Sequence, residues 1–272
     1  MNAAAPSHGS RVASAFAGLD PAGLPGLIPY VTAGFPRLDD TGAMLTAAER
    51  AGCLLAEVGI PFSDPLADGP TVQRTGQRAL ENGMRLSLAL DQVARARGAG
   101  LRLPLALMTY TNPVLAHGVE RFAADCASAG ADAVIVPDLP LDEAEEVRAA
   151  ADRAGLALIL MVAPTTTASR LEAACRRAAG FVYCVSVTGI TGARARISEE
   201  ALDLLRRVRD VTPLPRALGF GLSRHEHLES LRGHAEAAVV GSALLDAVSA
   251  EPGDPGATAE RFLLAMRGVG TS

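Results

Sequence analysis

The stretch LLAEVGIPFSDPLADGP (54–70) carries the pattern that decides the fold. A short apolar run, LLAEV (54–58), ends in a loop rich in Pro and Gly, as a buried strand does where it leaves a parallel sheet. Seven similar runs lie on either side of it, with Ala-, Leu-, Arg- and Glu-rich helical stretches between them: GLIPYV (26–31), PLALM (104–108), DAVIV (132–136), LALIL (156–160), FVYCV (181–185), LPRALG (214–219) and AAVV (237–240).

Eight strand-helix units in about 250 residues predict an α/β fold, a single (β/α)8 TIM barrel with an extra N-terminal helix. An open doubly wound sheet is the alternative, but it normally has fewer strands, and no GxGxxG follows the first run. Helices are expected from Asp39, from Asp142 and from Ser198, where hydroxyl or carboxylate groups suit a first turn.

The domain organisation expected from the 272 residues is a flexible N-terminal tail over residues 1–10 and one barrel domain over residues 11–272. EPGDPG (251–256) reads as a linker before a final helix.

The composition narrows the classes of partner. Hydrophobic residues make up 49% of the chain, the net charge is −5, and no Arg-rich block concentrates positive charge, so we expect no nucleic acid partner. No apolar run is long enough to span a membrane and the first residues do not resemble a secretory signal, so we expect no membrane contact and a cytoplasmic location.

The cationic residues exclude several kinds of chemistry, because all 25 are Arg and the chain has no Lys. Schiff-base catalysis, a P-loop lysine and lysine-anchored pyridoxal phosphate are therefore excluded. The four Cys are dispersed and are expected to be reduced core residues. The five His form no ligand set, and His225 and His227 are expected at the surface, so neither a metal nor a cofactor is predicted.

Catalytic groups in a barrel lie at the C-terminal ends of the strands and in the loops that follow them. Glu57 is in such a position, and Ile60, Pro61 and Phe62 follow closely enough to exclude water. Burial there raises the pKa of the Glu57 carboxyl toward the range useful for proton transfer. The alternative is a carboxylate that pairs with an Arg at the rim of the barrel.

Glycine-bearing loops follow the last three runs, at residues 188–192, 219–223 and 241–242. In barrels such loops, together with the N-terminus of a short helix, offer backbone N–H groups to a phosphate. The three together favour a phosphate site.

These segments resemble the tryptophan synthase alpha subunit family, whose members are indole-3-glycerol-phosphate lyases. The most specific part is AEVGIPFSDPLADGPTVQ (56–73), and the resemblance extends from IPYVTAGFP (28–36) to VVGSAL (239–244). It implies cofactor-independent retro-aldol cleavage of indole-3-glycerol phosphate to indole and glyceraldehyde 3-phosphate, in tryptophan biosynthesis.

The resemblance also implies roles for individual residues. Glu57 corresponds to the general acid/base, Asp68 to the carboxylate that holds the indole N–H, and Tyr183 to a tyrosine beside the glutamate. The remaining correspondences are Tyr30, Met108, Ile135 and Thr191 with substrate contacts and Gly192, Gly221, Gly241 and Ser242 with phosphate contacts.

The family's partner is the beta subunit of an α2β2 tetramer. Asp64 and Pro65, with Asn112 and Pro113, match regions that contact it, although Asp, Asn and Pro are also ordinary turn residues.

The residues themselves agree with this chemistry. Carbon-carbon cleavage needs an electron sink, and an indole ring protonated at C3 serves as its own sink, so two differently tuned carboxylates suffice. Two other functions stay open at this point: a binding subunit that mainly activates its partner, and another phosphosugar barrel such as an isomerase, since late-strand phosphate loops are shared among barrels.

Overall fold

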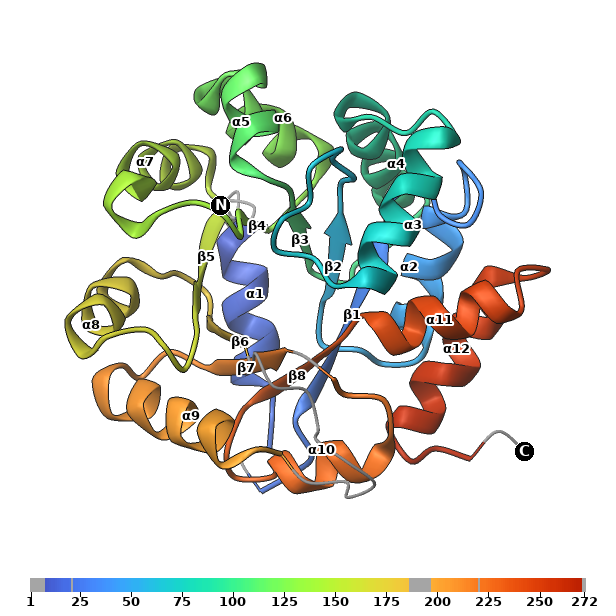
Figure 1. Cartoon of the computed structure of the whole chain (residues 1–272). Helices are drawn as coiled ribbons and strands as arrows, with labels where there is room; N and C mark the ends of the chain where they lie inside the picture. The colour runs from blue at the N-terminus through green and yellow to red at the C-terminus, as the bar shows by residue number, and fades with distance from the viewer. Residues whose placement is uncertain (1–7, 21, 186–196, 220, 271–272) are drawn as a thin grey trace, which may run out of the picture.

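Eight parallel strands close into a barrel in sequence order, as predicted (Figure 1). The computed structural model describes residues 8–20, 22–185, 197–219 and 221–270. The strands are β1 (Gly26–Thr32), β2 (Ala56–Gly59), β3 (Leu105–Met108), β4 (Ala133–Ile135), β5 (Ala157–Val162), β6 (Val182–Val185), β7 (Arg216–Gly219) and β8 (Ala237–Val240).

The helices other than α1 form an outer ring around the strands (Figure 1). The helical segments of the described residues are α1 (His8–Ala17), α2 (Thr41–Arg50), α3 (Pro70–Glu81), α4 (Leu86–Gly98), α5 (Thr111–His117), α6 (Val119–Ala129), the 3-10 turn η1 (Leu141–Glu143), α7 (Ala144–Ala154), α8 (Ala168–Arg177), α9 (Glu199–Val211), α10 (His225–Leu231), α11 (Ser242–Ala250) and α12 (Pro255–Met266).

Every predicted apolar run overlaps one of the eight strands, because a parallel strand covered on both faces must be apolar throughout. Two prolines lie at the start of the run around β7, but Pro213 and Pro215 both precede Arg216, so neither interrupts the ladder.

Helix α1 is the extra N-terminal helix, and it packs against the inside of the barrel. Its Val12 and Phe16 are buried in the same cluster as inward-facing strand residues. The Phe16 ring lies 5.4 Å from that of Phe181, and Phe181 lies 6.4 Å from the ring of Tyr183. A column of aromatic rings therefore runs from α1 through the barrel interior.

The boundaries at the two ends of the chain differ from those predicted. Helix α1 begins at His8, inside the stretch expected to be a tail, while residues 1–7 lie outside the described residues. At the other end, Asp254 caps α12 by accepting a hydrogen bond from the Ala257 N–H, so Pro255 and Gly256 of the expected linker already belong to the helix.

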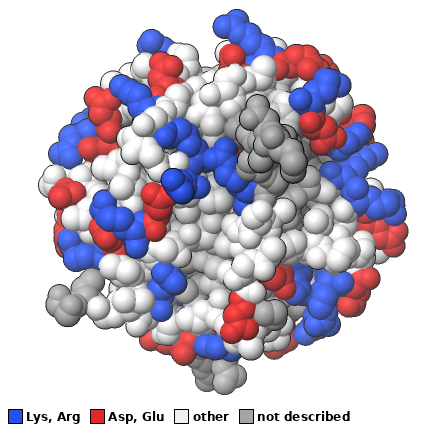
Figure 2. All heavy atoms as spheres, turned by 180° about the vertical axis from the view of Figure 1, so that it is seen from behind, with Lys and Arg blue, Asp and Glu red and all other residues white. Residues whose placement is uncertain are grey.

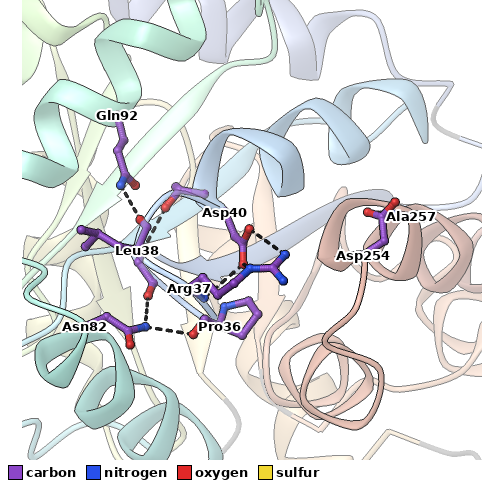
Figure 3. A network of polar contacts seen from close by, with 10 residues as sticks. Pro36, Arg37, Leu38, Asp40, Asn82, Gln92, Asp254 and Ala257 are labelled. Atoms are coloured by element: carbon purple, nitrogen blue, oxygen red, sulfur yellow. Dashed lines mark hydrogen bonds and ion pairs between the residues drawn. The ribbon is translucent and has the colours of Figure 1, made fainter.

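The loop after β1, on the same side as the other strand-to-helix loops, is fastened by side chains from the neighbouring unit (Figure 3). Asn82 donates hydrogen bonds to the carbonyls of Gly34 and Pro36, each over 2.9 Å, and Gln92 donates to that of Leu38. The carbonyls of this partly buried loop are thus satisfied by protein groups, which limits the motion of the loop next to the strand that carries Tyr30.

Figure 2 shows the opposite face, where Arg and acidic side chains are interspersed around the rim. Within the described ranges, no helix has the length and hydrophobicity needed to cross a membrane.

Candidate active site

A cavity of about 400 Å³ opens among the C-terminal strand ends and the loops that follow them. Its wall includes eight of the residues singled out from the sequence: Tyr30, Glu57, Asp68, Met108, Tyr183, Gly221, Gly241 and Ser242. Strands 1, 2, 3, 6, 7 and 8 therefore converge on one site, as the barrel prediction requires.

Glu57 lies on β2 and points inward, with 1% of its surface exposed. Neither of its carboxylate oxygens has a hydrogen-bond partner among the described residues, and none of the Arg side chains that the structure describes forms the ion pair considered as the alternative. Desolvation raises the pKa of this carboxyl to about 8, which agrees with the sequence argument. Glu57 is therefore mostly protonated near neutral pH and can donate a proton.

Asp68 lies in the loop between β2 and α3 and is only partly buried. Desolvation raises its pKa to about 6, and a hydrogen bond from the Tyr110 hydroxyl lowers it. Tyr110 in turn accepts a hydrogen bond of 3.2 Å from the Ala67 N–H, which fixes the loop beside it. Asp68 is consequently mostly charged at pH 7, while Glu57 is mostly neutral.

Tyr30 and Tyr183 stand on the cavity wall with Glu57, and both need a glycine opposite them. A Cβ on Gly59 would lie 1.9 Å from the Tyr30 hydroxyl, and one on Gly219 would lie 2.5 Å from the Tyr183 hydroxyl. Any other residue at either strand end would displace a ring from the cavity.

The end of the cavity near β7 and β8 includes two glycines that follow these strands. Gly221 adopts a φ of +74°, which favours glycine, and Gly241 precedes the first turn of α11. No side chain of the described residues caps α11, so the backbone N–H groups of its first turn are open to a ligand.

Some predicted site residues are not on this wall. Ile135 is fully buried in the barrel interior and does not line the cavity, although it is in register with Met108. Thr191 and Gly192 lie outside the described residues. Conversely, the sequence reasoning missed Tyr110 and several apolar wall residues, among them Val72, Met161 and Val239.

His227 was expected at the surface, and that expectation is wrong, since only 2% of it is exposed. The described residues bring together no group of three or more His, Cys, Asp or Glu that could hold a metal ion. The four Cys are buried and free, as predicted.

The four residues expected at a partner interface lie at the edge of the cavity region. Asp64 and Pro65 are in the loop that carries Asp68, and Asn112 and Pro113 are in the first turn of α5. Asp64 and Asn112 are exposed.

Comparison with known proteins agrees with this geometry. The family model "Tryptophan synthase alpha chain" matches residues 16–269. The chain belongs to the tryptophan synthase alpha chain family. Among its relatives, the Roseiflexus sp. (strain RS-1) alpha chain is 46% identical over 260 residues, covering 95% of this chain and 100% of that one. The Carboxydothermus hydrogenoformans alpha chain is 46% identical over 239 residues, covering 88% of this chain and 89% of that one.

Solved structures of the family have the same fold. In the Pyrococcus furiosus tryptophan synthase α2β2 complex, the matching chain is 38% identical with a TM-score of 0.85, covering 89% of this chain and 98% of that chain. A Mycobacterium tuberculosis tryptophan synthase gives 36% identity and a TM-score of 0.85, with coverage of 94% and 98%. As a tryptophan synthase alpha chain, the protein is a lyase that cleaves indole-3-glycerol phosphate in tryptophan synthesis.

Proposed function

We propose that Glu57 and Asp68 carry out the cleavage of indole-3-glycerol phosphate between them. The observation that carries this proposal is the contrast between the two carboxyls, one buried and mostly protonated near pH 7, the other mostly charged, on the wall of one cavity. Acid/base assignments follow from such pairs of differently tuned groups.

The reaction balances with these two groups alone. Glu57 donates its proton to C3 of the indole, and the Asp68 carboxylate stabilises the resulting indolenine cation through the ring N–H. The Glu57 carboxylate then takes the proton of the side-chain hydroxyl, the carbon-carbon bond breaks, and its electron pair returns to the ring. Indole and glyceraldehyde 3-phosphate leave, and Glu57 ends as it began, protonated.

The other wall residues have supporting roles in this proposal. Tyr30, Tyr183 and Met108 enclose the indole ring, which suits their amphipathic or apolar surfaces. The backbone at Gly221 and Gly241, with Ser242 at the start of α11, receives the phosphate. For Thr191, Gly192 and Ile135 the substrate roles rest on the family resemblance alone.

The partner in this proposal is the beta subunit of an α2β2 tetramer, contacted through Asp64, Pro65, Asn112 and Pro113. Two exposed leucines support the location, because Leu66 is 90% exposed in the same loop as Asp64 and Leu115 is 56% exposed on the same helix as Asn112. Exposed apolar side chains beside a polar rim are typical of a protein interface. We place the protein in the cytoplasm, with residues 11–272 acting as one domain.

The experiment is release of indole from indole-3-glycerol phosphate by the wild type and by Glu57→Gln and Asp68→Asn, each with and without the beta subunit. Each variant should lose about 10²- to 10⁴-fold in kcat. Near-normal release by Glu57→Gln would overturn its role, and no turnover by the wild type in either case would favour a subunit that only activates its partner.

A further inference from the structure

The loop between β7 and α10 forms part of the cavity wall through residues 221–223. Gly221, the first of these residues, has a positive φ of 74°, a conformation that other residues rarely adopt. A hydrogen bond to a residue behind the loop can hold this conformation.

His227 makes that contact. The Ser223 N–H donates a hydrogen bond of 3.0 Å to Nδ1 of His227, and the His227 N–H donates one of 3.1 Å to the Arg224 carbonyl. The two bonds tie the end of the loop to the first turn of α10. That helix is itself fixed, since its Leu228 and Leu231 are almost fully buried.

The hydrogen bond determines the form of the imidazole. Because Nδ1 accepts, the ring is neutral and its hydrogen is on Nε2, which is buried without a partner among the described residues. Burial, with Arg224 nearby, lowers the pKa of His227, which agrees with a neutral ring. A buried donor left unpaired is unfavourable, so packing alone does not explain a histidine here, whereas acceptance from Ser223 does.

We propose that His227 is a positioning residue that holds residues 221–223 in the conformation that receives the substrate's phosphate. The inference rests on the proposed phosphate site and adds a residue outside the cavity wall to it. His227 contacts no substrate in this proposal, and its effect passes through the Ser223 backbone. Because the phosphate is remote from the bond that breaks, losing this support weakens substrate binding and the transition state equally.

The test compares three variants of the full chain in indole release and in calorimetric binding of glycerol 3-phosphate. His227→Leu removes the acceptor and should raise both the KM for indole-3-glycerol phosphate and the Kd for glycerol 3-phosphate about tenfold, with kcat within about twofold of the wild type. His227→Asn, whose Oδ1 can stand close to the place of Nδ1, should restore both constants.

His225→Leu is the matched control, with the same substitution on the same helix. His225 faces away from the loop and donates from Nδ1 to the Met266 carbonyl over 3.0 Å, so its loss should leave KM unchanged. If His227→Leu fails to fold, His227→Gln replaces it in the comparison with His227→Asn, because the side-chain oxygen of Gln lies one bond too far out to take the place of Nδ1.

Unchanged KM and Kd in His227→Leu, or equal impairment in His227→Asn, would overturn the inference. Failure of the proposed phosphate site looks different, because the wild type itself would then bind no glycerol 3-phosphate in competition with substrate. If Ser242→Ala weakens the binding of glycerol 3-phosphate and His227→Leu does not, the phosphate site stands and only the role of His227 is refuted.

Discussion

Replacing Glu57 with Gln should lower kcat by about 10²- to 10⁴-fold. It should also stabilise the protein relative to the wild type, and by more near neutral pH than in acid. Burial raises the pKa of this carboxyl from 4.5 to about 8, so between these pH values the folded chain keeps a proton that the unfolded chain releases. Unfolding is then favoured by about 1.4 kcal/mol for each pH unit. A buried catalytic acid thus lowers stability where the enzyme works.

The sign and size of this destabilisation follow from the pKa of Glu57 in the unfolded and folded states. Below about pH 4.5 Glu57 is protonated in both states and has no effect on stability. Above that pH the loss of unfolding free energy grows, reaches about 3 kcal/mol at pH 7 and levels off above about pH 8. Gln cannot ionise, so the difference in unfolding free energy between variant and wild type should increase by about 2 to 3 kcal/mol from pH 5 to pH 7.

Urea unfolding at pH 5, 6 and 7 measures this difference, with the m-value checking that both proteins unfold alike. Glu146→Gln, an exposed carboxylate on α7, is the control and should follow the wild-type pH dependence. If the unfolding free energies of Glu57→Gln and the wild type change in parallel with pH, the raised pKa of Glu57 is refuted. If Glu57→Gln still releases indole at the wild-type rate, Glu57 is not the proton donor.

Three other changes test the site. Tyr110→Phe removes a hydrogen bond that lowers the pKa of Asp68, so the acidic limb of the kcat/KM profile, expected near pH 6, should move to higher pH; an unmoved limb would contradict the assignment. Gly59→Ala places a Cβ 1.9 Å from the Tyr30 hydroxyl, so the Tyr30 ring should move and indole release should fall about tenfold or more. A crystal structure of the variant with the Tyr30 ring in its original place would contradict this reasoning. Leu66→Asp should leave the free energy of unfolding, measured in urea, within about 0.5 kcal/mol of wild type. It should weaken association with the beta subunit, measured by calorimetry.

The architecture could be predicted well from the sequence because each strand is a short apolar run, a signal set by burial on both faces. Its limits were at the boundaries. The second run reads as a strand from Leu54, but β2 begins at Ala56, since apolar residues also precede the ladder where the chain enters the barrel.

The position of Glu57 on the cavity wall could be predicted because it stands at the end of a strand, whereas the choice of Asp68 came from the family resemblance. Ile135 is buried among inward-facing residues but does not line the cavity, and an apolar run alone does not show which of its residues reach the cavity. Tyr110, after β3, contacts the loop after β2 that carries Asp68, and no local pattern in the sequence reveals a contact between two separate loops. His227 and His225 differ in burial only because one side of α10 faces the barrel, and a helix of seven residues gives too little pattern to tell which.

The aromatic column from Phe16 to Tyr183 joins parts of the chain that are synthesised far apart in time. Helix α1 is synthesised before all eight strands, yet Phe181, the ring partner of its Phe16, is made only after five of them. The contact that joins α1 to the rings beneath the cavity can therefore form only once the second half of the barrel is being made.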